Sequence, residues 1–295
     1  MDKTKRLTNN WHLKEIPKIL HLYWGGGKLS YLRYLTIATF HYYNPEWKII
    51  LYSALKEQFD YHWKTHEQEY SQDYVDCYWK ISDDVVHKVV VDFDAIGFHN
   101  DASAVHKSDF IRWKVLSETG GVWADMDVLF IKPMNDLYFN TRNNRKVNTV
   151  FCIEPDAHYH SIGFLMSSAN NDYYKIAHRY SFGRYNKTLY QSIGSEMLNE
   201  HLPTLESGRI GNSIPLNVSM DVVYAYNGLH VHEIFGDNAP QRLTERSIGI
   251  HWYAGHQLAG RYLNATNGGL KKLNNSVIEQ QIEKFYENIN SNGIL

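Results

Sequence analysis

The stretch that decides the fold prediction runs from Lys107 to Pro133 and reads KSDFIRWKVLSETGGVWADMDVLFIKP. It predicts a helix that two glycines end, then a short apolar strand, then a turn that carries Asp125 and Asp127. Because side chains two apart at a strand end point to the same side, the two carboxylates lie roughly 6–7 Å apart along the strand. Such a pair can hold a hard divalent cation and leave positions open for phosphate oxygens.

The predicted helix brings an acid and an arginine to one side. Asp109 and Arg112 are three residues apart, so they share a helix face. Arg112 offers a planar fork suited to phosphate or carboxylate, and Asp109 can accept hydrogen bonds from sugar hydroxyls. The alternative is a local ion pair on a solvated face, worth only a few tenths of a kcal/mol. The stretch as a whole indicates a metal-dependent enzyme that handles a nucleoside diphosphate.

Strands and helices alternate before this stretch, which predicts an α/β fold with a mostly parallel central sheet flanked by helices. Ligands of such sheets bind at the carboxyl ends of the strands. Trp24 and the glycines after it end the first strand, so they are expected at the same edge as Asp125. The expected elements are strands over 18–24, 47–52 and 85–91, and helices over 30–43, 54–69 and 101–119, the last capped by Asn100 or Asp101.

The chain after Pro133 is expected to complete one domain that spans residues 1–295. In this hypothesis residues 17–133 bind the nucleotide and the metal, and residues 149–295 shape the acceptor side. Short strands are expected over 122–124, 129–132, 149–153, 162–167, 222–225, 230–234 and 248–253, helices over 172–180 and 189–201, and an exposed loop over 140–148. A final helix is expected from Ser276, with Glu279 completing a capping box.

Composition excludes several classes of protein. The net charge of -2 does not indicate nucleic-acid binding, which usually requires a basic stripe. Cys77 and Cys152 are far apart and form no zinc or disulfide pattern. The first residues show no apolar leader, and no run is long enough to span a membrane. We therefore expect a soluble protein of a cytoplasm, its own or a host's, or one peripheral to a membrane.

The acidic turn by itself leaves other functions open, because two nearby carboxylates occur often by chance. One alternative is a phosphatase of the haloacid-dehalogenase type, with Asp125 as nucleophile and Asp127 as acid and base. That class predicts a second acidic motif downstream, which the sequence around Asp237 lacks. A non-catalytic carbohydrate-binding protein is the other alternative, since 14% of the residues are aromatic and some rings can stack on sugars.

Three motifs resemble those of the DXD-containing sugar-nucleotide glycosyltransferases of GT-A fold, the group of the yeast mannosyltransferases and of bacterial capsule and lipopolysaccharide transferases. The clostridial glucosylating toxins are more distant members. The opening segment IPKILHLYWG ends at Trp24 and Gly25, and the central block joins KSDFIR to GGVWADMD. Ile250-His251-Trp252 is similar to a late motif of the family. The central block is the most specific of the three.

The resemblance implies a hexosyltransferase that uses a UDP- or GDP-sugar, a Mn²⁺ or Mg²⁺ ion, and a glycan or other hydroxyl acceptor, with retention of configuration. It implies that Tyr23 and Trp24 bind the nucleobase and that Asp109 and Arg112 bind the sugar and diphosphate. The implied metal ligands are Asp125, Asp127 and His251, where Asp125 also contacts the ribose and His251 is alternatively a contact to the diphosphate. The implied catalytic residues are Asp109, Arg112, Asp125 and Asp127.

Some positions depart from the family pattern. Trp123 stands where the family often has tyrosine, so stacking on the donor is expected but a hydroxyl contact is lost. His256 lies on a loop that is expected to face the phosphates. Gly194-Ser195-Glu196 replaces a common Gly-Pro, which leaves the acceptor side open, with Glu196 an acceptor contact, a catalytic carboxylate or a surface residue.

Overall fold

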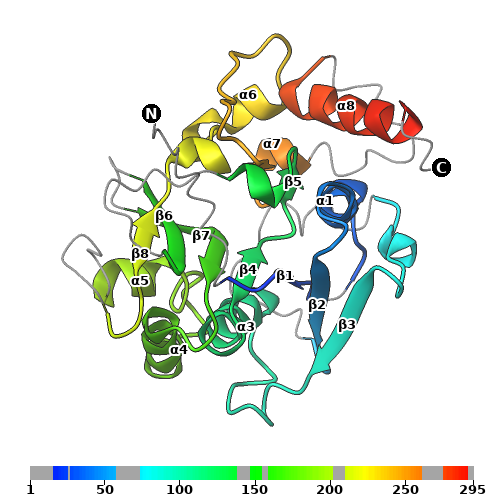
Figure 1. Ribbon diagram of the computed structural model, residues 1–295. Coiled ribbons are helices and arrows are strands. Elements are labelled where there is room, and N and C mark those ends of the chain that lie inside the picture. The colour runs from blue at the N-terminus through cyan, green and yellow to red at the C-terminus, as the bar shows by residue number, and fades with distance from the viewer. Residues whose placement is uncertain are drawn as a thin grey trace, which may run out of the picture.

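The computed structural model describes residues 16–25, 27–57, 74–137, 147–154, 159–201, 210–260 and 275–291. Within these residues seven strands form the main sheet (Figure 1). β7 runs antiparallel to both of its neighbours, and the other pairs are parallel, which confirms the predicted mixed and mostly parallel α/β sheet. In spatial order the strands are β3 (Val86–Val91), β2 (Lys48–Ala54), β1 (Ile19–Tyr23), β4 (Gly121–Ala124), β7 (Tyr159–Ser167), β6 (Thr149–Glu154) and β8 (Pro215–Asn217).

The central strands are apolar on both faces because helices cover both sides. β1 reads ILHLY and β4 reads GVWA, and nearly every residue in them is buried. One face packs against α3 (Ala104–Glu118), α4 (Asp172–Arg184) and α5 (Ser195–His201). The other packs against α1 (Tyr31–Tyr43), and beyond it lie α6 (Val231–Phe235), α7 (Gln257–Gly260) and α8 (Val277–Ser291) (Figure 1).

A second, two-stranded sheet joins distant parts of the chain. β5 (Val128–Phe130) pairs antiparallel with β9 (Gly249–His251). The register places His251 opposite Val128, the residue directly after Asp127. The backbone N–H of Trp252 also donates to the carbonyl of Asp127 at 2.9 Å. This pairing is what brings the end of the chain to the acidic turn.

The predicted helix boundaries hold in part. Ser30 caps α1, and Ser276 accepts the N–H of Glu279 at the start of α8 as predicted. The Glu279 carboxylate accepts the N–H of Asn275 rather than that of Ser276, so only half of the predicted capping box is made. The predicted cap of α3 was wrong: Ser103 accepts the bond from the His106 N–H, whereas Asn100 ties the loop after β3 to Asp92.

Gly120 ends the region of α3 as predicted. Its φ is +70°, and a Cβ there would lie 2.5 Å from the backbone at Ser168 and Ala169. Glycine is therefore needed at this position both for its conformation and for the close approach of the chain.

Several predictions for the second half were wrong. The expected strand over 222–225 is a 3₁₀ turn, Met220–Val222, followed by coil, and the expected strand over 230–234 is helix α6. α5 begins at Ser195 rather than 189, and β8 was not predicted. Runs of four or five apolar residues do not distinguish helix from strand, so their neighbours decide.

Some expectations lie outside the described residues. The expected helix over 54–69 is wrong at its start, because β2 continues to Ala54 and a bend follows, and its remainder from 58 is not described. Most of the expected loop over 140–148 also lies outside the described residues.

Short 3₁₀ turns occur at Tyr78–Lys80, Met134–Asp136 and Gly228–His230. Among the described helices, none has both the length and the apolar character needed to cross a membrane.

Candidate active site

The candidate site lies at one edge of the main sheet. β1, β2, β4 and β6 all end at this edge, and β7, which runs the other way, begins there. Trp24 follows β1, Asp125 follows β4, and Tyr159 begins β7. The structure therefore gathers side chains from distant parts of the sequence where a parallel sheet is expected to bind its ligand.

Backbone hydrogen bonds hold the acidic turn rigidly. The N–H of Asp125 donates to the carbonyl of Gly163 at 2.8 Å, and the hydroxyl of Thr36 donates to the carbonyl of Met126 at 2.9 Å. Oδ2 of Asp127 accepts a bond from the N–H of Ala254 at 2.9 Å. These contacts aim one oxygen of Asp127 at the backbone and leave its Oδ1 for another partner.

Asp125, Asp127 and His251 come together as the sequence predicted. One ligand atom from each residue lies within 4.8 Å of the others, and Nε2 of His251 is 3.2 Å from Oδ1 of Asp127. Burial opposes ionisation of Asp127, but His251, Arg33 and the bond from Ala254 together hold the pKa of its carboxyl below its usual value. An ionised carboxylate at this position favours a cation.

The cluster fits a divalent cation. Within the described residues, buried Oδ1 of Asp127 and Nδ1 of His251 have no hydrogen-bond partner. The absence of a side chain at Gly163 also leaves room, since a Cβ there would lie 2.8 Å from Nε2 of His251 and 3.1 Å from Oδ2 of Asp125. Two carboxylates and an imidazole suit Mn²⁺ at least as well as Mg²⁺.

Arg112 joins the two predicted acids into a buried row. Its NH1 lies 3.0 Å from Oδ1 of Asp109, and its NH2 donates to Oδ1 of Asp125 at 2.8 Å. The predicted pair on one helix face is therefore present, and it is buried rather than solvated. The guanidinium also lies 4.9 Å from the centre of the Trp123 ring. Arg112 is thus placed to orient Asp125.

Asp109 has an unusual environment for a carboxylate. Its side chain is almost fully buried, and its Oδ2 has no hydrogen-bond partner within the described residues. Burial raises the pKa of Asp109 to about 7, with Arg112 opposing the shift and Asp125 adding to it. The group can therefore donate or accept a hydrogen bond near neutral pH.

The structure gives Trp123 a different place from the one expected. Its ring is fully buried, so it has no exposed face on which a donor could stack. Its indole Nε1 donates to Oδ1 of Asp125 at 2.9 Å. The family often has a tyrosine here, and the loss of its hydroxyl was expected to remove a polar contact. The indole N–H of Trp123 makes a polar contact instead, to the acidic turn.

The residues expected at the nucleobase lie around the end of β1. The Tyr23 ring is buried and its hydroxyl donates to Glu57 at 2.9 Å, whereas the Trp24 ring is half-buried. Arg33 of α1 lies 4.8 Å from the centre of the Trp24 ring, and its charge also acts on Asp127. Arg33 thus connects the expected nucleobase contact with the metal cluster.

Sequence reasoning missed Arg33, although a signal was present. Arg33 lies in the first turn of a helix, where the helix dipole favours acidic residues and disfavours a cation. It also missed Tyr253, whose φ of +54° is uncommon for a bulky residue and precedes the N–H that holds Asp127. No pattern in the sequence marks such a backbone conformation.

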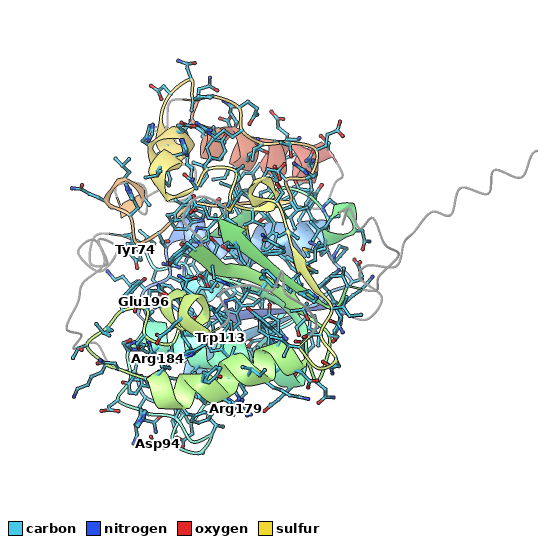
Figure 2. The ribbon with its side chains drawn as sticks, turned by 90° about the vertical axis from the view of Figure 1, so that its left-hand side faces the viewer. Tyr74, Asp94, Trp113, Arg179, Arg184 and Glu196 are labelled. Atoms are coloured by element: carbon cyan, nitrogen blue, oxygen red, sulfur yellow. The ribbon has the colours of Figure 1, made fainter. Side chains whose placement is uncertain are left out.

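Two other predicted positions are exposed. His256 is exposed at the start of α7, where its Nδ1 accepts a bond from the N–H of Leu258 at 3.2 Å. Glu196 is exposed in the first turn of α5; Figure 2 shows it at the surface, above α4 in that view. The roles expected for both residues stay predictions.

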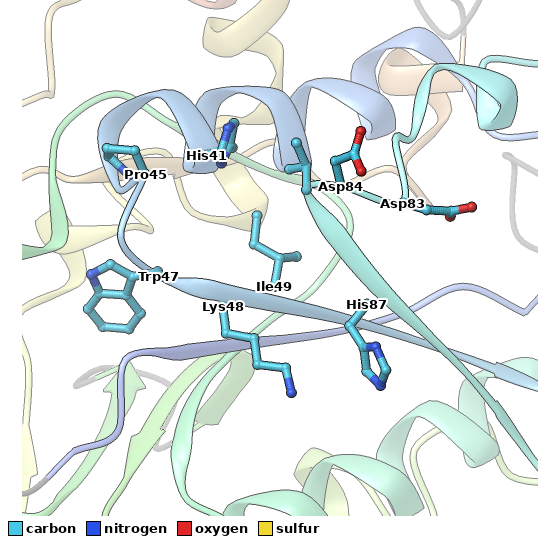
Figure 3. Close-up of a pocket in the computed structure, with 9 residues that line it drawn as sticks. His41, Pro45, Trp47, Lys48, Ile49, Asp83, Asp84 and His87 are labelled. Atoms are coloured by element: carbon cyan, nitrogen blue, oxygen red, sulfur yellow. The ribbon is translucent and has the colours of Figure 1, made fainter.

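A separate recess lies at the opposite edge of the sheet. It has a volume of about 290 Å³ and is lined at the starts of β2 and β3 by residues that include Lys48, Asp83 and His87 (Figure 3). Its residues come from the amino ends of the strands, away from the acidic turn. The candidate active site is therefore not this recess.

Part of the chain matches a known family. Residues 34–144 are similar to the family model described as a glycosyltransferase sugar-binding region containing a DXD motif. The matched region includes Asp109, Arg112 and the acidic turn, whereas Trp24 and His251 lie outside it. The match favours sugar transfer over the phosphatase alternative, and the mixed α/β sheet agrees with the GT-A fold expected for the family.

Solved structures similar to this chain include several glycosyltransferases. The PaToxG glycosyltransferase has 17% identity and a TM-score of 0.43, with 65% of this chain and 72% of that one covered. The galactosyltransferase LgtC, in complex with donor and acceptor sugar analogues, has 13% identity and a TM-score of 0.43, covering 80% and 87%. GlyE of Streptococcus pneumoniae TIGR4 has 12% identity and a TM-score of 0.45, covering 91% and 64%. Comparison with curated protein sequences gives no significant match.

Proposed function

We propose that this chain moves a hexose from a UDP- or GDP-sugar to the hydroxyl of a glycan or other acceptor, with retention of configuration and with a divalent cation. The observation that carries the proposal is the meeting of Asp125, Asp127 and His251 within 4.8 Å at the carboxyl edge of the sheet. Asp125, Asp127 and His251 would hold Mn²⁺ or Mg²⁺. Such an ion supplies positive charge for the diphosphate of the donor.

In this proposal the surrounding residues orient the two carboxylates. The guanidinium of Arg112 and the indole N–H of Trp123 both bind Oδ1 of Asp125, which leaves its Oδ2 directed toward the cluster. The N–H of Ala254 does the same for Asp127 by occupying its Oδ2. Each acid therefore presents one oxygen, and little reorganisation is needed when the substrate binds.

The donor would lie along the edge of the sheet from Trp24 to Asp109. Trp24 offers its ring to the nucleobase, and Arg33 beside it offers positive charge to the phosphates. Asp109, buried at the far side of Arg112, would bind the hydroxyls of the sugar. Its pKa near 7 lets it either donate or accept such a bond.

The sugar-transfer reaction changes no oxidation state, so it requires no oxidant or reductant. The bond between the anomeric carbon and the β-phosphate oxygen breaks, and its electron pair stays with the diphosphate. A bond forms between the anomeric carbon and the acceptor oxygen, and the hydroxyl proton passes to the departing diphosphate. The positive charge near Asp127, which includes Arg33, stabilises the negative charge that develops.

A panel of UDP- and GDP-hexoses with Mn²⁺ or Mg²⁺ tests the proposal through release of the nucleotide. We expect release from at least one donor, and a loss of about 100-fold or more in Asp127→Asn, because a metal ligand is removed. Asp83→Asn is the matched control, since its side chain is 84% exposed and lies at the opposite edge of the sheet. Equal release by wild type and Asp127→Asn would refute the metal assignment. Absence of release from every donor would favour a non-catalytic carbohydrate-binding protein.

A further inference from the structure

The segment from Leu189 to Glu196 crosses directly over the buried carboxylate of Asp109. Nε2 of His106 donates to the carbonyl of Leu189 at 2.9 Å, and Nε1 of Trp113 donates to the carbonyl of Ile193 at 2.7 Å. His106 and Trp113 lie seven residues apart in α3, with Asp109 between them on the same side. α3 therefore holds this segment at two points, one on each side of Asp109.

Gly194 marks the closest approach of this segment to Asp109. A Cβ at Gly194 would lie 2.7 Å from Oδ2 of Asp109, the oxygen that has no hydrogen-bond partner within the described residues. The backbone at this point therefore forms one wall of the space that Asp109 faces.

Two partly exposed tyrosines belong to this segment and to the strand beside it. Tyr190 is 41% exposed and Tyr159, at the start of β7, is 38% exposed. Partial burial raises the pKa of Tyr190, and the negative charges of Asp109, Asp125 and Asp127 raise it further. The charges of the proposed donor site therefore act on the Tyr190 hydroxyl.

Tyr159 is connected to the same segment. Burial raises the pKa of Tyr159, which a hydrogen bond to Ser195 lowers and the charges of Asp109 and Glu196 raise again. Glu196 is exposed next to Ser195. Tyr159 and Glu196 therefore both lie next to Ser195, in the segment that passes over Asp109.

We propose that Tyr159, Tyr190 and Glu196 form the acceptor subsite and that the acceptor is a neutral saccharide. This inference rests on the proposed function, because it takes the donor sugar to lie against Asp109. The partly exposed rings offer flat surfaces for the apolar face of a pyranose, and Glu196 accepts hydrogen bonds from its hydroxyls.

The charge around the subsite selects the class of acceptor. The charges that act most strongly on the two rings come from Asp109, Asp125, Asp127, Glu196 and Arg112. Arg112 pairs with Asp109 and Asp125, and the proposed cation would balance Asp125 and Asp127, so Glu196 is the unbalanced charge beside the rings. A phosphorylated or carboxylated acceptor would meet this carboxylate with the same sign of charge, whereas a neutral sugar would not.

Saturation-transfer NMR with the methyl α- and β-glycosides of glucose, galactose and mannose tests the subsite in the presence of UDP and Mn²⁺. We expect the wild-type chain to bind at least one glycoside and Tyr190→Ala to bind it about tenfold more weakly. Tyr190→Phe keeps the ring and should bind as wild type does. Phe182→Ala is the control, since that ring is 47% exposed on α4 and packs against Phe110.

The possible results separate this inference from the proposed function. Absence of binding to every neutral glycoside, equal binding by Tyr190→Ala and wild type, or preferred binding of glucuronic acid would each overturn the neutral-saccharide subsite. Hydrolysis of the donor by water, measured on the wild-type chain without any glycoside, tests the proposed function alone. If the chain binds the glycosides but hydrolyses no donor, the saccharide subsite stands and the proposed transferase activity is refuted.

Discussion

Replacement of Gly163 by alanine tests the metal cluster through its shape rather than its ligands. Gly163 lies in β7, and its carbonyl accepts the N–H of Asp125. The added Cβ would lie 2.8 Å from both Cδ2 and Nε2 of His251 and 3.1 Å from Oδ2 of Asp125. Real Cβ atoms do not approach other atoms so closely, so the His251 ring has to move.

The size of the movement sets the expected effect. His251 must shift by about 0.6 Å to reach the 3.4 Å at which ordinary contact begins. Metal–ligand distances in working sites hold to within about 0.2 Å, so the shift is about three times that tolerance. We expect the affinity for Mn²⁺ to fall about 10- to 100-fold, the range seen when the support of a ligand is removed, or about 1.4–2.7 kcal/mol.

Titration calorimetry with Mn²⁺ and Mg²⁺ measures this effect on the purified chain. Gly183→Ala is the matched control, because Gly183 lies in α4 and a Cβ there meets no atom within 4 Å. That substitution should leave metal affinity unchanged and stabilise the helix by about 0.5–1 kcal/mol. Circular dichroism of both variants establishes that they fold. The same Mn²⁺ affinity in a folded Gly163→Ala as in Gly183→Ala would refute the cluster as a metal site.

Three further substitutions test other parts of the account. Trp123→Phe keeps a buried ring but removes the N–H that Asp125 accepts, so kcat/KM for the donor should fall about 10- to 100-fold; unchanged steady-state kinetics would remove its positioning role. Arg33→Gln should weaken the binding of UDP or GDP about tenfold in calorimetry and leave the affinity for uridine or guanosine unchanged. An equal loss of affinity for the nucleotide and the nucleoside would show that Arg33 acts on the base instead. Burial lowers the pKa of His21 to about 4 against 6.5 in the unfolded chain, so protonation favours unfolding. The free energy of unfolding should therefore fall by about 2 kcal/mol between pH 7 and pH 5 in urea denaturation. His21→Gln should show a smaller fall, and an equal fall in both proteins would show that another group is responsible.

The elements with long periodic patterns and clear end signals were predictable. α1 has Ser30 before it and Asn44 after it, and α3 ends at the glycine pair that begins at Gly120. The central strands were predictable because helices on both sides require continuous apolar runs. The segments after 201 were not, since β8 and α6 are too short for a periodic signal.

The candidate site was predictable in its members but not in their arrangement. The spacing of Asp109, Arg112, Asp125 and Asp127 indicated a diphosphate and metal site, and these residues do lie together. The buried position of Trp123, by contrast, depends on which face of β4 is covered by α3, and the sequence does not state this.

The sequence by itself determined the presence of the acidic turn, because the apolar strand after the glycine pair ends where Asp125 begins a polar segment. Only the tertiary structure decided what surrounds that turn. The pairing of β5 with β9 brings His251 to it from more than 120 residues away, and α3 holds the segment from Leu189 to Ile193 over Asp109 through two backbone carbonyls. These contacts depend on strand register and on helix packing across the whole chain, which no local pattern of residues encodes.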